Sequence, residues 1–162
     1  MTSSSTSSAM PIMTSEQFLE HWQGNRALTR RVIDAFPEDK LFTYAVGGMR
    51  PFSTLAMEFI AMAVPTLNGV ITGKWAEFVE PKATTKVELL NMWDESTAQI
   101  NALWPTIPPA RFQEVDTAFG RWKMAIYDLL LYVRDNEIHH RGQGYVYLRS
   151  LGIEPPHFWE RG

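Results

Sequence analysis

The chain has 162 residues, about the length of one domain, and it is long enough to bury a substantial core. Its formal net charge of −3 and scattered basic residues argue against a nucleic-acid groove, because phosphate binding needs clustered lysine and arginine. The absence of cysteine excludes disulfides, thiolate metal ligands and a cysteine nucleophile, and it is compatible with the cytoplasmic location that we expect.

The N-terminal stretch MTSSSTSSAMPIM is rich in serine and threonine and carries no charged side chain. It lacks the basic and apolar segments of a secretory signal, and its few apolar residues cannot offset the entropy of ordering. We therefore expect residues 1–13 to form a flexible tail and residues 14–162 to form a single domain. No run of eighteen apolar residues occurs, so we expect no membrane-spanning segment.

The first predicted helix begins at a capping box. Thr14 and Gln17 have the required spacing, and the helical pattern continues to Phe36, which precedes a proline. A turn-rich link follows, in which Gly47 and Gly48 disfavour a regular element.

Two further helices are predicted in the middle of the chain. One covers residues 53–71, and Pro65 should kink or shorten it because proline removes a backbone donor and clashes with the preceding turn. The other covers residues 85–104, where Thr85 and Glu88 repeat the capping-box spacing.

A fourth helical pattern covers residues 121–151 and follows a proline-rich connection. Four helices of about twenty residues, each with one apolar stripe, predict an all-α four-helix bundle. The long links after the first and third helices leave room for a connection other than simple up-down-up-down.

Polar residues interrupt the apolar face of the fourth helix. Steps of three and four residues give an apolar seam formed by Trp122, Ile126, Leu129 and Val133. The next two positions in that register are Asn136 and His140, which should therefore point inward, one above the other. His139 should point closer to the edge of the bundle.

Glu58 interrupts the apolar stripe of the second helix in the same way. Burying an ionised carboxylate costs several kcal/mol unless the group is paired or binds a metal. A pocket between the second and fourth helices is therefore expected. Purely structural alternatives stay open: His140 as a hydrogen-bonded core residue, Asn136 as a structural hydrogen bond, and Glu58 as a partner of His140 or Arg141.

Two features beside this candidate site favour a structural role. The GQG sequence at residues 142–144 lacks the strand–turn–helix context of a phosphate loop, so it is interpreted as a close approach between helices. Arg141 is expected to pair with a carboxylate such as Glu58, Glu137 or Asp135.

Two segments carry a resemblance to a known family. EIHHRGQGYVYLRSLGIEPP at residues 137–156, with MRPFSTLAMEFI at residues 49–60, resembles the DinB-like family of bacterial damage- or stress-inducible proteins. In that family HHRGQ is followed in order by YLR, LG and PP. The match covers the last forty residues well, and the helical pattern covers most of the rest from Met13.

The resemblance implies a four-helix bundle in which three histidines hold a divalent metal, one from the second helix and two from the fourth. Here Asn136 stands at one of these positions, His140 matches another, and Glu58 is the nearest inward residue of the second helix. The implied metal site is therefore Glu58, Asn136 and His140, suited to zinc, nickel or manganese but weaker than three imidazoles. His139 would then act as a general base or orient the site.

Two functions follow as hypotheses. The first is a metal-dependent thiol transferase or hydrolase acting through a low-molecular-weight thiol or water. The second is a non-catalytic stress-response module that binds a small molecule or dimerises and retains a degraded metal site. The resemblance also implies a homodimer. Its aromatic anchors would be Tyr145, Tyr147, Phe158 and Trp159, unless the last two cover the end of the bundle.

Overall fold

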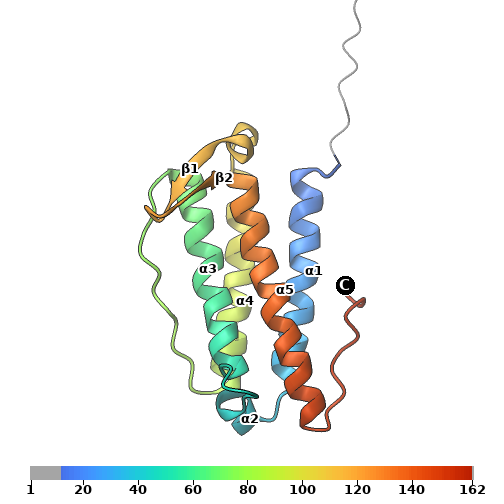
Figure 1. Ribbon diagram of the computed structural model, residues 1–162. Coiled ribbons are helices and arrows are strands. Elements are labelled where there is room, and N and C mark those ends of the chain that lie inside the picture. The colour runs from blue at the N-terminus through green and yellow to red at the C-terminus, as the bar shows by residue number, and fades with distance from the viewer. Residues whose placement is uncertain (1–11, 162) are drawn as a thin grey trace, which may run out of the picture.

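The computed structural model describes residues 12–161, so nearly all of the predicted tail at residues 1–13 lies outside the described part of the chain. Its elements are α1 (Ser15–Ala35), α2 (Glu38–Thr43), α3 (Phe52–Thr72), α4 (Lys86–Leu103), two 3-10 turns (Trp104–Thr106 and Pro109–Gln113), β1 (Val115–Ala118), β2 (Trp122–Ala125) and α5 (Ile126–Ser150). The four long helices α1, α3, α4 and α5 lie side by side, with α2 at one end and the two strands at the other (Figure 1). The predicted all-α bundle is confirmed, apart from this small hairpin.

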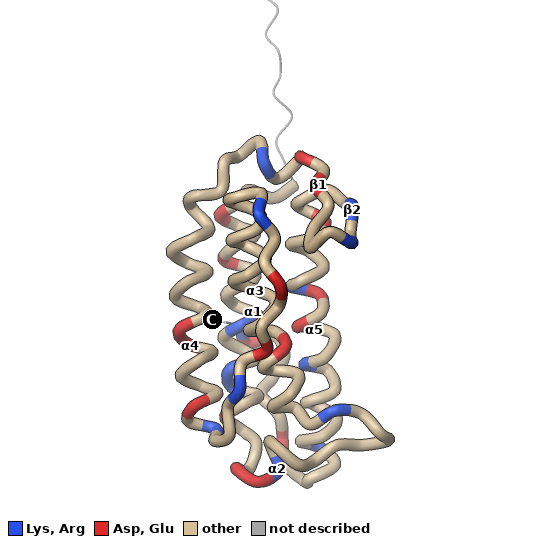
Figure 2. Tube along the Cα trace, turned by 90° about the vertical axis from the view of Figure 1, so that its left-hand side faces the viewer, with Lys and Arg blue, Asp and Glu red and all other residues tan. Residues whose placement is uncertain are grey.

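The order of directions is not up-down-up-down. The chain runs one way in α1, the opposite way in α3 and again in α4, and returns in α5 (Figure 1). The segment at residues 73–85 makes this possible by running back along the bundle between α3 and α4. Figure 2 shows this segment running lengthwise over one face of the molecule, from the hairpin end toward α2. The crossover therefore follows the second long helix, and not the first or third as expected.

Both predicted capping boxes are present. Thr14 Oγ1 accepts a 3.2 Å hydrogen bond from Gln17 N, and Gln17 Oε1 accepts a 2.9 Å bond from Thr14 N. Thr85 and Glu88 repeat the arrangement at the start of α4. Each box satisfies backbone N–H groups that have no partner within the helix, which fixes where the helix begins.

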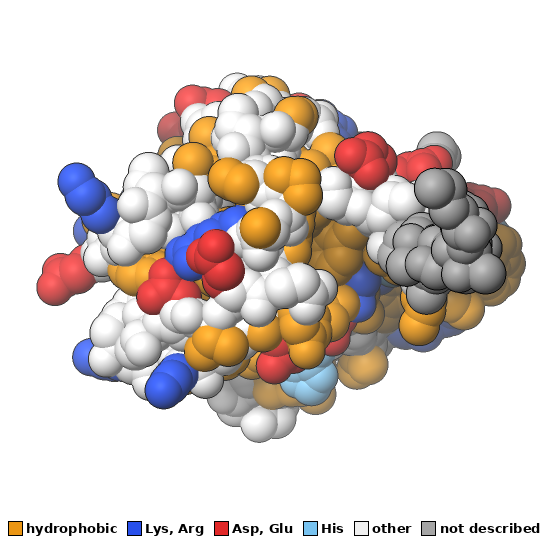
Figure 3. Space-filling view, turned by 90° about the horizontal axis from the view of Figure 1, so that it is seen from above, with side chains coloured by type: hydrophobic (Ala, Val, Ile, Leu, Met, Phe, Trp, Pro, Cys, Tyr) orange, Lys and Arg blue, Asp and Glu red, His pale blue; other side chains and the backbone are white. Residues whose placement is uncertain are grey.

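The prediction that the last helix begins near Arg121 is wrong. Residues 122–125 form β2, which pairs antiparallel with β1, and α5 begins only at Ile126. Trp122 consequently lies outside the apolar seam of the helix and is 45% exposed. Seen from this end, hydrophobic side chains lie among charged and polar ones (Figure 3).

The hairpin turn needs two residues in the left-handed region. Phe119 has φ 52° and Gly120 has φ 67°. This conformation is free of strain for glycine but costs phenylalanine about 1 kcal/mol. The Phe119 ring packs 4.1 Å from the ring of Phe78 and 5.0 Å from that of Trp75, measured between centroids, and these contacts offset the cost.

Pro65 does not shorten α3, which continues as a helix to Thr72. By length and composition alone, this helix is apolar enough to cross a membrane, and half of the relevant window is buried inside the bundle. The central helix of a packed core meets the same criterion, because it is apolar on nearly every side.

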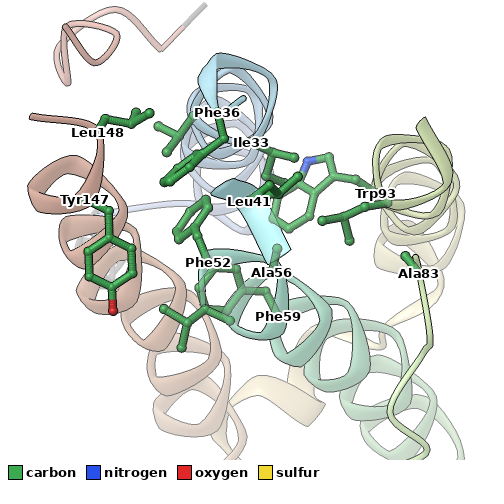
Figure 4. Close-up of a cluster of buried hydrophobic side chains, with 13 residues drawn as sticks. Ile33, Phe36, Leu41, Phe52, Ala56, Phe59, Ala83, Trp93, Tyr147 and Leu148 are labelled. Carbon is green, nitrogen blue, oxygen red and sulfur yellow. The ribbon is translucent and has the colours of Figure 1, made fainter. Parts of the chain in front are cut away.

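The core consists of two apolar clusters, one toward each end of the bundle. Near α2, Phe36 and Phe52 stack with centroids 5.2 Å apart (Figure 4). Toward the hairpin, Trp22, Leu67 and Trp104 belong to the second cluster. The level between the two clusters contains the polar residues that the sequence analysis had drawn attention to.

Candidate functional site

A layer of polar side chains separates the two apolar clusters. We call it the polar layer, and it consists of Asn25, Arg26, Thr29, Glu58, Ser96, Asn136, Glu137, His140 and Arg141. Each long helix contributes at least one residue, because each passes through this level between its two ends. The layer has two parts: a half-buried group between α3 and α5, and a fully buried group between α1, α4 and α5.

The half-buried group brings together the three residues of the predicted site. Asn136 Nδ2 donates a 3.1 Å hydrogen bond to Glu58 Oε1, and His140 Nε2 lies 3.8 Å from the same oxygen. Asn136 Nδ2 also lies 3.3 Å from Met62 Sδ. The i, i+4 spacing in α5 thus places an amide and an imidazole against one carboxylate of α3.

Arg50, which the sequence analysis did not single out, completes this group. It lies just before α3, and its Nη1 donates to Glu58 Oε2 in a direct ion pair. Arg50 is also tied to α5, because its carbonyl oxygen accepts a 3.0 Å hydrogen bond from Tyr147 Oη. Both oxygens of Glu58 are therefore engaged by groups of the protein.

These contacts determine the charge states. Burial alone would raise the pKa of Glu58, but hydrogen bonds from Arg50 and Asn136 outweigh it and hold the pKa below its ordinary value. Partial burial lowers the pKa of His140, and the neighbouring Glu58 carboxylate offsets only part of this effect. At neutral pH the site therefore holds an ionised carboxylate, a guanidinium and a neutral imidazole.

His140 has further contacts that fix its ring. Gln143 Nε2 lies 3.1 Å from His140 Nδ1, and the ring of Phe59 stacks on the imidazole with centroids 6.2 Å apart. His139 lies on the exposed side of α5, and its ring meets that of His140 edge to face at 4.8 Å. Its assignment as a general base stays a prediction.

The fully buried group contains a charged pair, of which Arg26 carries no periodicity signal in the sequence. Glu137 and Arg26 are 2% and 1% exposed, and Arg26 Nη1 lies 3.9 Å from Glu137 Oε2. Burial raises the pKa of Glu137 and lowers that of Arg26 to about 10. The guanidinium also lies over the ring of Trp93 at 4.0 Å, which further compensates its charge.

Arg141 is buried, as an architectural role requires, but its nearest partners are not carboxylates. Its Nη1 donates to Asn25 O at 3.0 Å, and its Nη2 donates to Asn25 Oδ1, also at 3.0 Å. Thr29 Oγ1 lies 3.2 Å from Arg141 Nη1 and 2.6 Å from Glu137 Oε1, so it links the two charges. The backbone carbonyl and the side-chain amide of Asn25 are thus the direct partners of Arg141, where the prediction expected a carboxylate.

A pocket of about 510 Å³ opens beside Glu58. Its walls come from α3, α5, the hairpin and the crossover segment at residues 73–85, and they are mostly apolar. Ala61, Met62, Leu129 and Val133 line its inner side. Glu58 and Arg50 form the part of its polar wall that belongs to the polar layer, and Thr66 and Glu80 also line it, so the candidate site and the pocket are continuous.

The candidate site does not have the arrangement of a metal site. In residues 12–161, no three histidine, aspartate or glutamate side chains come together as a ligand set. Asn136 directs its Nδ2 at Glu58, and Arg50 occupies the other carboxylate oxygen. A divalent ion would have to displace a guanidinium and reorient an amide, so as arranged these groups fit an ion pair and not a metal.

Among the aromatic residues predicted as dimer anchors, Tyr147 differs from Phe158 and Trp159. Tyr147 is fully buried in the core near α2, so it cannot serve as an anchor. Phe158 and Trp159 are 57% and 65% exposed. The segment after α5 runs back beside α1 and not over the end of the bundle (Figure 1). The homodimer itself stays a prediction.

Comparison with known proteins agrees with this architecture. A crystal structure of a DinB-like protein from Bacillus subtilis superposes with a TM-score of 0.72 at 20% identity, covering 90% of this chain and 99% of that one. A DinB-like protein from Bacillus cereus gives a TM-score of 0.71 at 19% identity, covering 88% and 95%. A search of curated proteins found no match. The model of the DinB family matches residues 5–161, and the chain therefore belongs to the DinB family.

Proposed function

We propose that this DinB-family chain binds a small molecule in the pocket beside Glu58 and does so without a metal ion. The observation that carries the proposal is the pocket itself. Its volume of about 510 Å³ lies within the range of roughly 300–1,000 Å³ that is usual for small-molecule sites. Its mostly apolar wall with a few polar groups, among them the fixed pair of Arg50 and Glu58, is also usual for such sites.

The arrangement of Arg50 and Glu58 supports binding in preference to metal catalysis. An ion pair at the wall of an apolar pocket provides both a donor and an acceptor that orient a ligand. The hydrogen bond from Asn136 and the contacts of His140 hold Glu58 in place, so little reorganisation is needed when a ligand enters.

The proposal is tested with N-phenyl-1-naphthylamine, a neutral dye whose fluorescence rises in apolar surroundings. The parent chain should bind it saturably with one molecule per chain. Ala61→Phe places a ring inside the pocket and should abolish this binding. Ala98→Phe adds the same ring on the exposed face of α4 and should leave binding unchanged.

Two results would reject the proposal. One is unsaturable binding in the parent chain, and the other is equal binding by the Ala61→Phe and Ala98→Phe variants. Circular dichroism and thermal melts of the three proteins establish that any loss does not come from unfolding.

A metal-dependent thiol transferase or hydrolase is the second candidate. The observation in its favour is the 3.8 Å distance between the neutral His140 imidazole and the Glu58 carboxylate, because imidazoles and carboxylates are groups that commonly bind zinc in proteins. Elemental analysis of untagged protein tests this candidate. About one ion per chain, lost in His140→Ala, supports it. Metal-free protein whose stability is unaffected by chelators rejects it.

A further inference from the structure

The outer wall of the same pocket is built from aromatic rings. Phe78 comes from the crossover segment, Phe119 and Trp122 come from the hairpin, and Tyr132 comes from α5. The rings of Phe78 and Phe119 stack with centroids 4.1 Å apart, and Trp122 meets Phe119 edge to face at 6.1 Å. Three separate parts of the chain thus bring their aromatic side chains to one opening.

These rings are accessible. Phe78 is 40% exposed, Trp122 is 45% exposed and Tyr132 is 59% exposed. Phe119 is half-buried, and its backbone has a positive φ of 52°. Aromatic faces left open at a pocket attract cations, because the ring quadrupole is negative above and below the plane.

The charges of the lining also favour a cationic ligand. Among the described residues that line the pocket, Arg50 is the one cation, and it is paired with Glu58. Glu80, from the crossover segment, adds a second carboxylate at the exposed end. The lining charges therefore sum to −1, and the unmatched carboxylate belongs to Glu80, two residues after Phe78 in the crossover segment.

We propose that the pocket selects an organic ammonium ion with an apolar body. This inference rests on the proposed function and specifies the class of its ligand. The cationic group would lie against the exposed rings of the outer wall, Trp122 and Tyr132, with Glu80 as its counter-charge. The apolar body would fill the inner pocket beside Met62. A ligand carboxylate has no free cation to meet, since Glu58 already engages the guanidinium of Arg50.

The test uses three probes of similar size and different charge: benzyltrimethylammonium, neutral 3-phenyl-1-propanol and anionic 3-phenylpropanoate. Isothermal titration of the full chain at low salt gives their dissociation constants. Benzyltrimethylammonium should bind about tenfold more tightly than the alcohol, as expected for a partly desolvated cation over aromatic faces. The phenylpropanoate should bind most weakly.

Two variants with matched controls locate the selectivity. Glu80→Gln should weaken binding of the ammonium about threefold and leave binding of the alcohol unchanged, as expected for an exposed charge pair. Glu77→Gln removes a carboxylate from the same segment but outside the lining, and it should have no effect. Trp122→Leu should reduce the preference for the cation, whereas Trp159→Leu, at another exposed tryptophan, should not.

The possible outcomes separate this inference from the proposed function. Equal affinity for all three probes, with binding lost in Ala61→Phe, overturns the ammonium ligand but retains a general small-molecule pocket. Tightest binding of the phenylpropanoate overturns it in favour of recognition through Arg50. No binding of any probe, together with no binding of the naphthylamine dye, rejects the pocket and the inference together.

Discussion

Asn136 on α5 donates a 3.1 Å hydrogen bond to Glu58 on α3, and this bond joins two helices across the polar layer. An imidazole in place of the amide would offer a nitrogen lone pair at the same point. Whether Glu58 forms an ion pair or binds a metal therefore depends on the groups that face it, above all the side chain at position 136.

The first prediction concerns that position. Asn136→His should create a set of one carboxylate and two imidazoles, with His140 one turn away, and should raise zinc affinity at least about tenfold over the parent chain. Competition with a chromophoric chelator measures the affinity. Asn136→Leu is the control and should show no gain. A histidine variant that binds zinc no better than the leucine variant contradicts the prediction.

The second prediction concerns the buried charges. Glu137→Gln leaves Arg26 and Arg141 in the interior without their counter-charge and should lower the free energy of unfolding by about 3–5 kcal/mol. Arg30→Ala breaks the exposed pair with Asp94, whose atoms are 2.7 Å apart, and should cost only about 0–1 kcal/mol. Urea denaturation of the two variants compares them. Similar costs would show that burial does not determine the effect.

The third prediction separates the two glycines of the GQG sequence. A Cβ at Gly144 would lie 2.6 Å from the ring of Phe52, which is itself stacked on Phe36, so Gly144→Ala should cost about 1–3 kcal/mol. Gly142 has open space at the same point, so Gly142→Ala should gain about 0.5–1 kcal/mol through helix propensity. Thermal melts should move in opposite directions, and a shift in the same direction would contradict the packing described above.

The fourth prediction concerns pH. Folding lowers the pKa of His140 from its ordinary value of 6.5, so the folded chain binds this proton less readily than the unfolded chain does. The contribution of the neutral imidazole to stability is therefore complete above about pH 6.5 and is lost as the pH falls toward the lowered pKa. Between about pH 7.5 and 5.5, the parent chain should lose more stability than His140→Gln does.

The difference between the stability–pH curves of the parent chain and the His140→Gln variant isolates the contribution of His140. Burial also lowers the pKa of His21, while burial raises that of Glu137, and both effects are common to the two proteins. Parallel pH profiles for the parent chain and the His140→Gln variant would show that His140 does not titrate in the way predicted.

The helices were predictable because their signals are local. Thr14 with Gln17 and Thr85 with Glu88 encode both capping boxes within four residues of sequence. The pairing of Glu58 with Asn136 and His140 was also accessible, because each residue interrupts an apolar stripe. Arg50 was not, since it lies in an irregular link where periodicity gives no direction.

Two parts of the structure could not be read from periodicity. Trp122 and Ile126 are spaced by four residues, as on a helical face, although Trp122 belongs to a strand. Along α5, a step of three from Val133 reaches Asn136 and a step of four reaches Glu137. Both residues are polar, so the pattern alone could not decide which one faces the centre of the core. In the structure, Glu137 is the buried one.

The central claim is that a small molecule binds beside Glu58, and the methionine methyl groups report on it directly. Met62 and Met124 line the pocket, whereas Met92 packs against the core cluster near α2. In a methyl NMR titration of ¹³C-methionine protein with benzyltrimethylammonium or the neutral dye, the Met62 and Met124 resonances should move together and saturate while Met92 stays fixed. Shifts confined to Met92, or no saturable shift at Met62 and Met124, would contradict the account.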